Sequence, residues 1–515
     1  MTSLPASRPG VAIQRELQDM TSVERLTAAA LLAGALLIRL LYIHQPVRHD
    51  EAYTYLYFAA QPLSSALSDY TVPNNHLFHT LLVKTVTSVL GGSLPAIRLS
   101  AFLAGLLIVP GVYLLTRRFG GDRGAALLAM APAAVWPELV HYSTNARGYS
   151  IVALAFLILL VLGDDMVERD TMRLAIAIAV VLAIGMWTAP FMLYPGGAAL
   201  LWIAVERGRR AGVSGVHGLL PRLGMTALLA GVLTAVAYSP VVFRSGLAPL
   251  VGNKYVVARS LSGFVAELPA FAGDVRNSLG LGVSIPLLGL FVVAAAFGAI
   301  FPREARGRRL ALVSTVLGWT ALLLVLTRRA PPARVLLFLV PLGCAYAGIG
   351  LALAVRRLAS VRRIDAHAAC AAMALLVAGL IAATAIRSRA VLRTLETGTL
   401  ADAPEIATYL LDRLHPGDRI VVRNPSDHPL DYYLLRRGGR RLREINAGPA
   451  TGRVFVVVEP RHLQTLQTVQ RIEPGLPWSE LAAPMPADTF ASARVFTFRF
   501  GSADSATGPK QPGQK

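Results

Sequence analysis

Eleven apolar runs, several of them shorter than a full membrane helix, constrain this chain more than any other feature. A helix needs about 20 apolar residues to cross a hydrocarbon core about 30 Å thick. Because 54% of the 515 residues are hydrophobic, the chain is too apolar for one soluble globule and is predicted to cross a membrane many times. The runs lie at 26–43, 97–115, 125–140, 150–162, 174–187, 191–205, 223–242, 283–301, 310–327, 335–355 and 368–386.

Arginine placement predicts the orientation of these spans. Short cytoplasmic loops hold an excess of Lys and Arg, and four arginine groups fall on one side if the N-terminus is inside. These groups are Arg117/Arg118/Arg123, Arg207/Arg209/Arg210, Arg303/Arg306/Arg308/Arg309 and Arg356/Arg357/Arg362/Arg363. Residues 1–24 are then cytoplasmic, and eleven spans place the C-terminus outside a plasma or inner membrane. No apolar run begins before Leu26, so we expect the first span to stay as an anchor and not to be a cleaved signal peptide.

A shorter apolar segment, 77–90, carries His79 and Lys84. If it crossed the membrane, every later arginine group would change sides. We therefore interpret it as an interfacial or re-entrant helix within a first outer loop that covers 44–96.

The formal net charge of +20 does not require a nucleic-acid partner, because the arginines lie at helix ends. Anionic lipid headgroups are a sufficient partner. Only two cysteines occur, Cys344 and Cys370, and both lie inside apolar runs. Their positions favour neither a zinc cluster nor a disulfide framework.

After residue 386 the chain becomes polar, with short alternating elements. The predicted fold is thus an all-α polytopic membrane domain over 25–386, with a small α/β extracytoplasmic domain over 387–501. Its predicted helices are 404–414, 430–437 and 461–472, and its predicted strands are 419–422, 454–458 and 493–500. The tail 502–515 is rich in Gly, Ser, Pro and Gln and is predicted to be disordered.

Two adjacent carboxylates, Asp50 and Glu51, follow the first apolar run where it would emerge into water. The pair is a candidate for acid–base chemistry. An ordinary charged loop at a membrane edge is the alternative, since a two-residue motif is common by chance.

Three short motifs resemble those of the type C glycosyltransferases, in the branch that contains the protein O-mannosyltransferases and the lipid A aminoarabinose transferases. The first is Asp50-Glu51. The second is 96–100, which enters the second span and contains Arg98, and the third is 142–149, which contains Arg147. An inside N-terminus and an outer C-terminal domain also agree with this family.

The chain departs from the family pattern at two places. Many relatives carry a glutamate just before Ala-Arg in the second outer loop, where this chain has Asn145. A basic residue or histidine followed by proline is common after the first-loop acids, and here His76 takes that place without the proline. We expect these differences to alter the preference for sugar and acceptor.

The resemblance implies transfer of a sugar from a polyprenyl phosphate to an acceptor hydroxyl or amine at the outer face, with inversion. Asp50 is the expected general base, since a hydroxyl is a poor nucleophile until it loses its proton. Glu51 is expected to orient the acceptor or to help hold a cation. A single displacement needs no second carboxylate as nucleophile.

The departing lipid phosphate gains negative charge, so fixed cationic donors should face it. The candidates are Arg98, Arg147 and Arg334. Each has an alternative interpretation: Arg98 could extend to the interface, Arg147 could be a solvated loop charge, and Arg334 could reflect a slip in the assigned topology.

Four residues are candidates for the acceptor side: Tyr53, Asn75, His76 and Tyr149. The long outer connection 243–281, with Lys254, Tyr255, Arg259, Glu267 and Asp274, could cover the donor. His49 and His76 could hold a divalent metal, Mg²⁺ or Mn²⁺, together with Asp50, although two histidines beside a carboxylate in a loop more often make plain polar contacts.

A transporter or flippase for a lipid-linked glycan is the alternative function, because it too would have many helices and buried charges. Transporters tend to contain internal repeats with matched broken helices, and none is visible here. An outer-face ligase that uses pyrophosphate-linked glycans stays open, and a non-catalytic sensor would leave Asp50, Arg98 and Arg147 unexplained.

Overall fold

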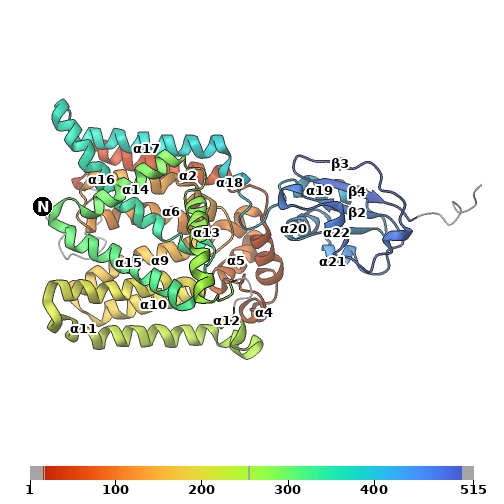
Figure 1. The fold of residues 1–515 in the computed structure, drawn as a ribbon, viewed down its shortest axis with the longest axis horizontal. Helices are drawn as coiled ribbons and strands as arrows, with labels where there is room; N and C mark the ends of the chain where they lie inside the picture. Colours follow the sequence, from red (N-terminus) through yellow and green to blue (C-terminus); the bar gives the residue numbers. More distant parts are fainter. Residues whose placement is uncertain (1–15, 17, 253–255, 501–515) are drawn as a thin grey trace, which may run out of the picture. The chain divides into compact units, whose positions relative to one another are not determined.

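The computed structural model describes residue 16 and residues 18–252 and 256–500, and the chain in it forms two compact units (Figure 1). The first unit contains Met1–His44 and Tyr57–Thr394, and the second contains Gln45–Leu56 and Leu395–Lys515. The predicted tail 502–515, most of the predicted cytoplasmic segment, and Lys254 and Tyr255 lie outside the described residues.

The first unit is helical. Its long helices are α2 (Ser22–Tyr42), α5 (Leu77–Leu90), α6 (Leu94–Arg118), α7 (Arg123–Val135), α9 (Tyr149–Arg169), α10 (Met172–Thr188), α11 (Leu193–Ser245), α13 (Leu261–Leu279), α14 (Ile285–Ile300), α15 (Arg306–Thr327), α16 (Leu339–Arg362) and α17 (Ala366–Ser388). Short elements join them: α4 (Leu63–Ser68), α8 (Pro137–Ser143), α12 (Ala248–Val251), α18 (Ala390–Arg393), and the 3-10 turns η2 (Pro190–Met192), η3 (Arg303–Ala305) and η4 (Ala333–Leu336).

Seven helices among the described residues are long and apolar enough to cross a membrane, and four further apolar helices are shorter. One of the seven, Pro190–Ser245, contains two of the predicted spans, and Gly212, with a φ of +67°, interrupts it between them. Two of the shorter helices, α10 and α14, coincide with predicted spans, and α7 covers the first part of a third. The multi-pass membrane fold is therefore confirmed, whereas the count of eleven spans stays a prediction.

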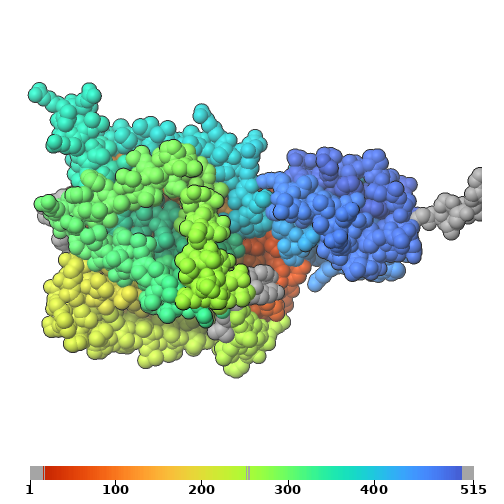
Figure 2. All heavy atoms as spheres, in the orientation of Figure 1, coloured from red at the N-terminus to blue at the C-terminus, as the bar shows by residue number. Residues whose placement is uncertain are grey.

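Two expectations for the first unit need correction. The predicted span 125–140 is broken, because Trp136 leaves the helical region (ψ 122°) and Pro137 begins the separate helix α8. The connection 243–281 is not an irregular loop, since it contains the 19-residue helix α13. This helix is capped by Ser260, packs against η4 and forms a ridge on the face shown in Figure 2.

The predicted inner arginine groups meet in space. Arg118, Arg210 and Arg308 come from three different groups, and all three form ion pairs with Asp164. Arg356, from the fourth group, pairs with Asp122. Three of the four groups therefore meet at one end of the helical unit, as one-sided arginine placement requires.

The second unit is a small α/β fold with a four-stranded sheet in the order β1-β2-β4-β3. Its strands are β1 (Arg419–Val422), β2 (Val454–Val458), β3 (Asp488–Thr489) and β4 (Arg494–Phe498). β1 and β2 are parallel, with Arg419 opposite Val454, and the other two pairs are antiparallel. Helices α19 (Ala403–Leu411), α20 (Asp427–Gly438), α21 (Leu442–Ile445) and α22 (Leu466–Gln470) complete the C-terminal part.

The predicted strands and the first two predicted helices of this unit are found with small shifts at their ends. The predicted helix 461–472 is wrong: a 3-10 turn, η5 (Pro460–His462), is followed by Leu463 with a φ of +56°. The Thr465 hydroxyl then caps the short helix α22 by accepting a hydrogen bond from the Thr468 N–H. A left-handed residue ends a helix, so the chain forms two short turns here.

Helices α14 and α16 of the first unit pack closely against each other. A Cβ added at Gly350 would overlap the Ala294 carbonyl, and one added at Gly298 would overlap the Tyr346 carbonyl. Small residues let membrane helices approach until their backbones touch. The spacing between α14 and α16 therefore depends on these two glycines.

We expect Gly350→Ala to lower the free energy of unfolding by about 1–3 kcal/mol, the usual effect of overpacking. Gly289→Ala, on the partner helix α14, is the control, because a Cβ there meets nothing within 4 Å. Thermal unfolding of the two purified variants in detergent would measure the difference. Equal midpoints would contradict the close packing of α14 and α16.

Candidate functional site

The acid pair lies on a short helix, α3 (His49–Tyr53), whose first N–H groups are bonded to distant residues. The His49 N–H donates to the Gly398 carbonyl at 3.1 Å, and the Asp50 N–H donates to the Thr397 carbonyl at 3.2 Å. These groups lack partners inside a helix and must find them elsewhere. The turn at residues 397–398 therefore fixes where Asp50 lies in the second unit.

Glu51 contributes to the same helix start. Its carboxylate accepts a hydrogen bond from the Arg48 N–H at 2.8 Å, and the side chain is fully buried. A glutamate that reaches back to the residue before its helix stabilises the N-terminus. Asp50 is only partly buried, so of the two acids it is the more accessible to a substrate.

Three further contacts dock the segment Gln45–Leu56 onto the C-terminal part of the second unit. The Val47 N–H donates to the Tyr433 hydroxyl at 3.1 Å, and Arg48 donates to the Glu396 carbonyl at 3.1 Å. Arg441, in a buried ion pair with Asp431, donates to the Leu56 carbonyl. The segment that the sequence assigned to the first outer loop thus packs with residues about 350 positions later.

The turn that holds α3 depends on Gly398. Its φ is +69°, and a Cβ there would lie 2.7 Å from the His49 Cβ and 2.6 Å from the Pro425 Cβ. No L side chain could occupy this place without moving α3 or the turn.

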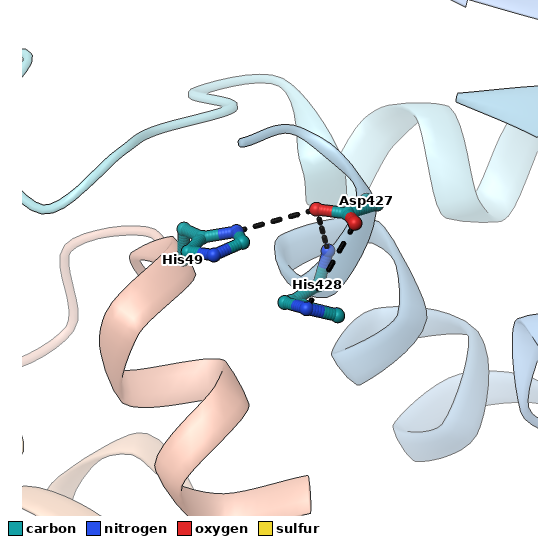
Figure 3. A group of neighbouring side chains, drawn as sticks. All are labelled: His49, Asp427 and His428. Carbon is teal, nitrogen blue, oxygen red and sulfur yellow. Dashed lines mark hydrogen bonds and ion pairs between the residues drawn. The ribbon is translucent and has the colours of Figure 1, made fainter. Parts of the chain in front are cut away.

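Beside Asp50, three side chains from α3 and the start of α20 form a compact group, shown in Figure 3: His49, Asp427 and His428. The His49 Nδ1 lies 3.2 Å from an Asp427 oxygen, and the His428 Nε2 lies 3.8 Å from the other. The Tyr53 ring packs edge-on against His428, with centroids 4.8 Å apart.

Burial sets the protonation of this group. It lowers the pKa of His428 to about 4, against the attraction of Asp427. Burial acts to raise the pKa of Asp427, but the hydrogen bond from His49 and the nearby His428 outweigh it, so the pKa of Asp427 lies below its ordinary value. At neutral pH the group therefore contains a carboxylate and a neutral His428 imidazole.

In the first unit, a second cluster surrounds Arg147. Its guanidinium donates to the Asn74 carbonyl at 2.7 Å and lies 3.2 Å from the His76 Nε2, while the Gly148 N–H donates to the His76 Nδ1 at 2.9 Å. Arg147 is buried, so it is not the solvated loop charge of the alternative interpretation. His76 orients the loop that carries Arg147.

Two guanidinium groups lie against the Tyr149 ring. Arg334 donates to the Tyr149 hydroxyl at 2.9 Å, and the guanidinium carbons of Arg147 and Arg334 lie 5.8 and 5.9 Å from the ring centroid. Burial lowers the pKa of His76 well below its ordinary value, and the charge of Arg147 adds to this effect. His76 is therefore neutral, and the positive charge of the cluster comes from the arginines.

Two further predicted residues of the first unit, Asn75 and Arg98, donate hydrogen bonds to main-chain carbonyl groups. Asn75 is buried and donates to the Ala66 and Asp69 carbonyls at 2.9 and 2.8 Å, which closes the loop before α5. Arg98 is fully buried and donates to the Ile43 carbonyl at 2.6 Å, so it does not extend to the interface.

Sequence reasoning missed two groups. Glu138 and His141 are fully buried on α8, with 3.5 Å between the His141 Nδ1 and the Glu138 carboxylate, and Asn145 lies 3.5 Å from the His141 Nε2. Their spacing on one helix face was a usable signal. Asp427 and His428 could not be connected with His49, since nothing local indicates which distant segments will meet.

The structure thus gathers Asn75, His76, Arg147, Tyr149 and Arg334 in the first unit, and His49, Asp50, Glu51 and Tyr53 in the second. The three-residue group includes His49 but neither Asp50 nor His76, with which the sequence had associated it.

Comparisons with known proteins agree with this architecture. Residues 74–239, about a third of the chain, match the family described as dolichyl-phosphate-mannose-protein mannosyltransferase. No curated protein sequence matched. The crystal structure of ArnT from Cupriavidus metallidurans in the apo state is similar with a TM-score of 0.58 and 16% identity, covering 94% of this chain and 99% of that chain.

The same ArnT bound to undecaprenyl phosphate gives a TM-score of 0.57 at 16% identity and the same coverage. Arabinosyltransferase EmbB from Mycobacterium smegmatis gives 0.39 at 15% identity, over 95% of this chain and 47% of that chain, which is too low to indicate a shared fold. The chain has the ArnT-like fold of the type C glycosyltransferases, and the resemblance predicted from the sequence is confirmed.

We expect Gly398→Ala to speed amide hydrogen exchange at His49 and Asp50, because the added methyl group would push the turn away from α3. Gly448→Ala is the control: its φ of +86° gives the same backbone strain, but nothing lies within 4 Å of the added Cβ. Exchange measured by mass spectrometry on peptides that cover 45–56 would separate the two. Equal exchange in both variants would contradict this account of how α3 is held.

Proposed function

We propose that this protein is a membrane glycosyltransferase that passes a sugar from a polyprenyl-phosphate donor to a hydroxyl or amine acceptor of the cell envelope. The observation that carries the proposal is the pair of guanidinium groups, Arg147 and Arg334, held against Tyr149 within an ArnT-like fold. Guanidinium groups suit a phosphate because they offer several N–H donors in a planar fork. The similar ArnT structure bound to undecaprenyl phosphate supports a lipid-phosphate partner.

The proposed reaction is a single displacement with inversion. The acceptor oxygen or nitrogen attacks the anomeric carbon, the bond from that carbon to the phosphate oxygen breaks, and polyprenyl phosphate leaves with the bonding electrons. Asp50 takes the proton from the acceptor as general base. Its partial exposure, beside a Glu51 that is engaged in capping α3, supports this assignment.

Arg147 and Arg334 would stabilise the negative charge that grows on the leaving phosphate, and preorganised cations stabilise such a transition state most when they are shielded from water. Arg98 is a third candidate for the donor side. In this scheme His76 is a positioning residue, because its two ring nitrogens contact Arg147 and Gly148.

The acceptor-side residues and the orientation of the protein in the membrane are proposed from the sequence. Tyr53, Tyr149, Asn75 and His76 are the proposed acceptor-side residues, and the hydrogen bonds of Asn75 to the Ala66 and Asp69 carbonyls favour a structural role for that residue. One-sided arginine placement favours a cytoplasmic N-terminus and an extracytoplasmic second unit. A flippase for a lipid-linked glycan is the alternative, and it would move the lipid without breaking the bond to the sugar.

We expect Asp50→Asn to lower sugar transfer by about 10²-fold or more, because the amide cannot accept the acceptor proton. The measurement is transfer of radiolabelled sugar from polyprenyl-phosphate donors to endogenous acceptors in membranes, at matched expression. Asp412→Asn, an exposed acid of the same unit, is the control. Full activity in Asp50→Asn would remove Asp50 from catalysis, and donor movement without transfer would favour the flippase.

We expect Arg147→Lys to lower kcat/KM for the donor by about tenfold or more, because lysine keeps the charge but loses the forked donors. Arg276→Lys, on the exposed face of α13, is the control. Initial rates at varied donor concentration in detergent would give both constants. An unchanged kcat/KM for Arg147→Lys would argue against a contact between this guanidinium and the donor phosphate.

A further inference from the structure

We propose that His49, Asp427 and His428 form a binding site for a divalent transition metal, of which zinc is the best candidate. The three side chains offer one ligand atom each, and these atoms all lie within 4.8 Å of one another. Figure 3 shows the His49 ring with a nitrogen directed at the Asp427 carboxylate and His428 on the adjoining turn of α20. All three belong to the second unit.

The spacing suits a small four-coordinate ion. Zinc binds His nitrogen and carboxylate oxygen at about 2.0–2.2 Å in tetrahedral geometry, which places neighbouring ligand atoms about 3.4 Å apart. The His49 Nδ1 lies 3.2 Å from one Asp427 oxygen and the His428 Nε2 lies 3.8 Å from the other, so both distances are close to this value. Small rotations of the side chains would bring all three atoms to one ion.

The donor set selects the class of metal. Two imidazoles and one carboxylate are typical of zinc, iron, nickel and copper, whereas Mg²⁺ and Ca²⁺ prefer oxygen ligands. This group differs in its residues and its metal preference from the Mg²⁺ or Mn²⁺ site expected from Asp50 and His49, which stays a prediction. Because three protein ligands leave one position of a tetrahedral ion open, a water or a substrate atom could complete it.

The surroundings supply second contacts for two of the ligands. The His49 Nε2 lies 3.1 Å from the Asn424 side-chain amide, and the backbone N–H of His428 donates to an Asp427 oxygen at 2.9 Å. A metal-bound imidazole needs an acceptor for its other N–H. Rotation of the Asn424 amide by 180° would present its oxygen to Nε2 and supply that acceptor.

The three side chains are partly exposed to water, and neighbouring rings restrict their movement. The side chains are 14%, 24% and 15% exposed for His49, Asp427 and His428. The Tyr53 ring packs against His428, and the His49 and His428 rings lie 4.6 Å apart. An ion can enter, and the ligands have little freedom to move away from one another.

A metal here would join α3 to α20 next to Asp50. His49 and Asp50 are consecutive, so an ion bound by His49 restrains the main chain that carries the proposed base. The proposed metal site depends only on His49, Asp427 and His428, whereas any effect of the metal on sugar transfer rests on the proposed function.

The test uses the purified full-length protein in detergent, first stripped of metal with a chelator. Zn²⁺ binding is measured by equilibrium dialysis with elemental analysis, and Co²⁺ is added separately because its visible spectrum reports coordination. We expect one equivalent of Zn²⁺ per chain, and a loss of affinity of about tenfold or more in His49→Gln, Asp427→Asn and His428→Gln. His415→Gln, an exposed histidine of the same unit, is the control.

Binding of less than one equivalent by the unmodified protein, or equal affinity in all four variants, would overturn the proposal, as would displacement of Zn²⁺ by a hundredfold excess of Mg²⁺. If one ligand variant fails to fold, the other two and the Co²⁺ spectrum still decide. Metal content and sugar transfer are measured independently, so a stoichiometric site in a protein without transfer would leave the metal proposal standing and contradict the proposed function.

Discussion

The second unit depends on two hydrogen bonds from the first residues of α3 to the turn at 397–398. α3 is short, and even with the π-helix η1 (Thr54–Ala59) that continues it, the helical stretch has little stability of its own, since nucleation costs more than its few internal bonds return. α3 exists because the turn carbonyls accept its first N–H groups and Glu51 caps its start. The position of Asp50 therefore depends on tertiary contacts. A substitution at the turn would move this acid although the two are far apart in the sequence.

Main-chain carbonyl groups stabilise the buried arginines of the first unit. Arg39, Arg98 and Arg147 each donate to main-chain carbonyl oxygens. A carbonyl dipole solvates a guanidinium without cancelling its charge, and ionisable groups inside membrane proteins are costly enough to need such partners. Arg39 contacts three helices in this way and ties them together. Arg147 differs, because side chains also contact it: the His76 Nε2 lies 3.2 Å away and the Tyr149 ring lies against it.

Local patterns predicted much of the fold. Apolar length identified the membrane helices, and the short apolar runs 419–422 and 454–458 identified β1 and β2 with their observed ends. Failures arose where a single residue decided the outcome: Pro137 divides a predicted span, and Leu463 stops a predicted helix. Helix α13 was missed although Ser260 is a normal cap. For the site, each motif was found, but the meeting of His49 with Asp427 depends on folding of the whole chain and leaves no trace in local sequence.

The division of chemical groups between the two units suggests how specificity arises in this chain. The family match, 74–239, lies in the first unit, where the arginines against Tyr149 suit a phosphate that all polyprenyl-phosphate donors share. The second unit holds the carboxylates and imidazoles, and its segment 45–56 is shaped by C-terminal residues outside that match. A shared donor group needs a fixed recognition site, whereas an acceptor is distinguished by what lies around the base. Under the proposed function, the surroundings of Asp50 in the second unit are the turn at 397–398 and the start of α20.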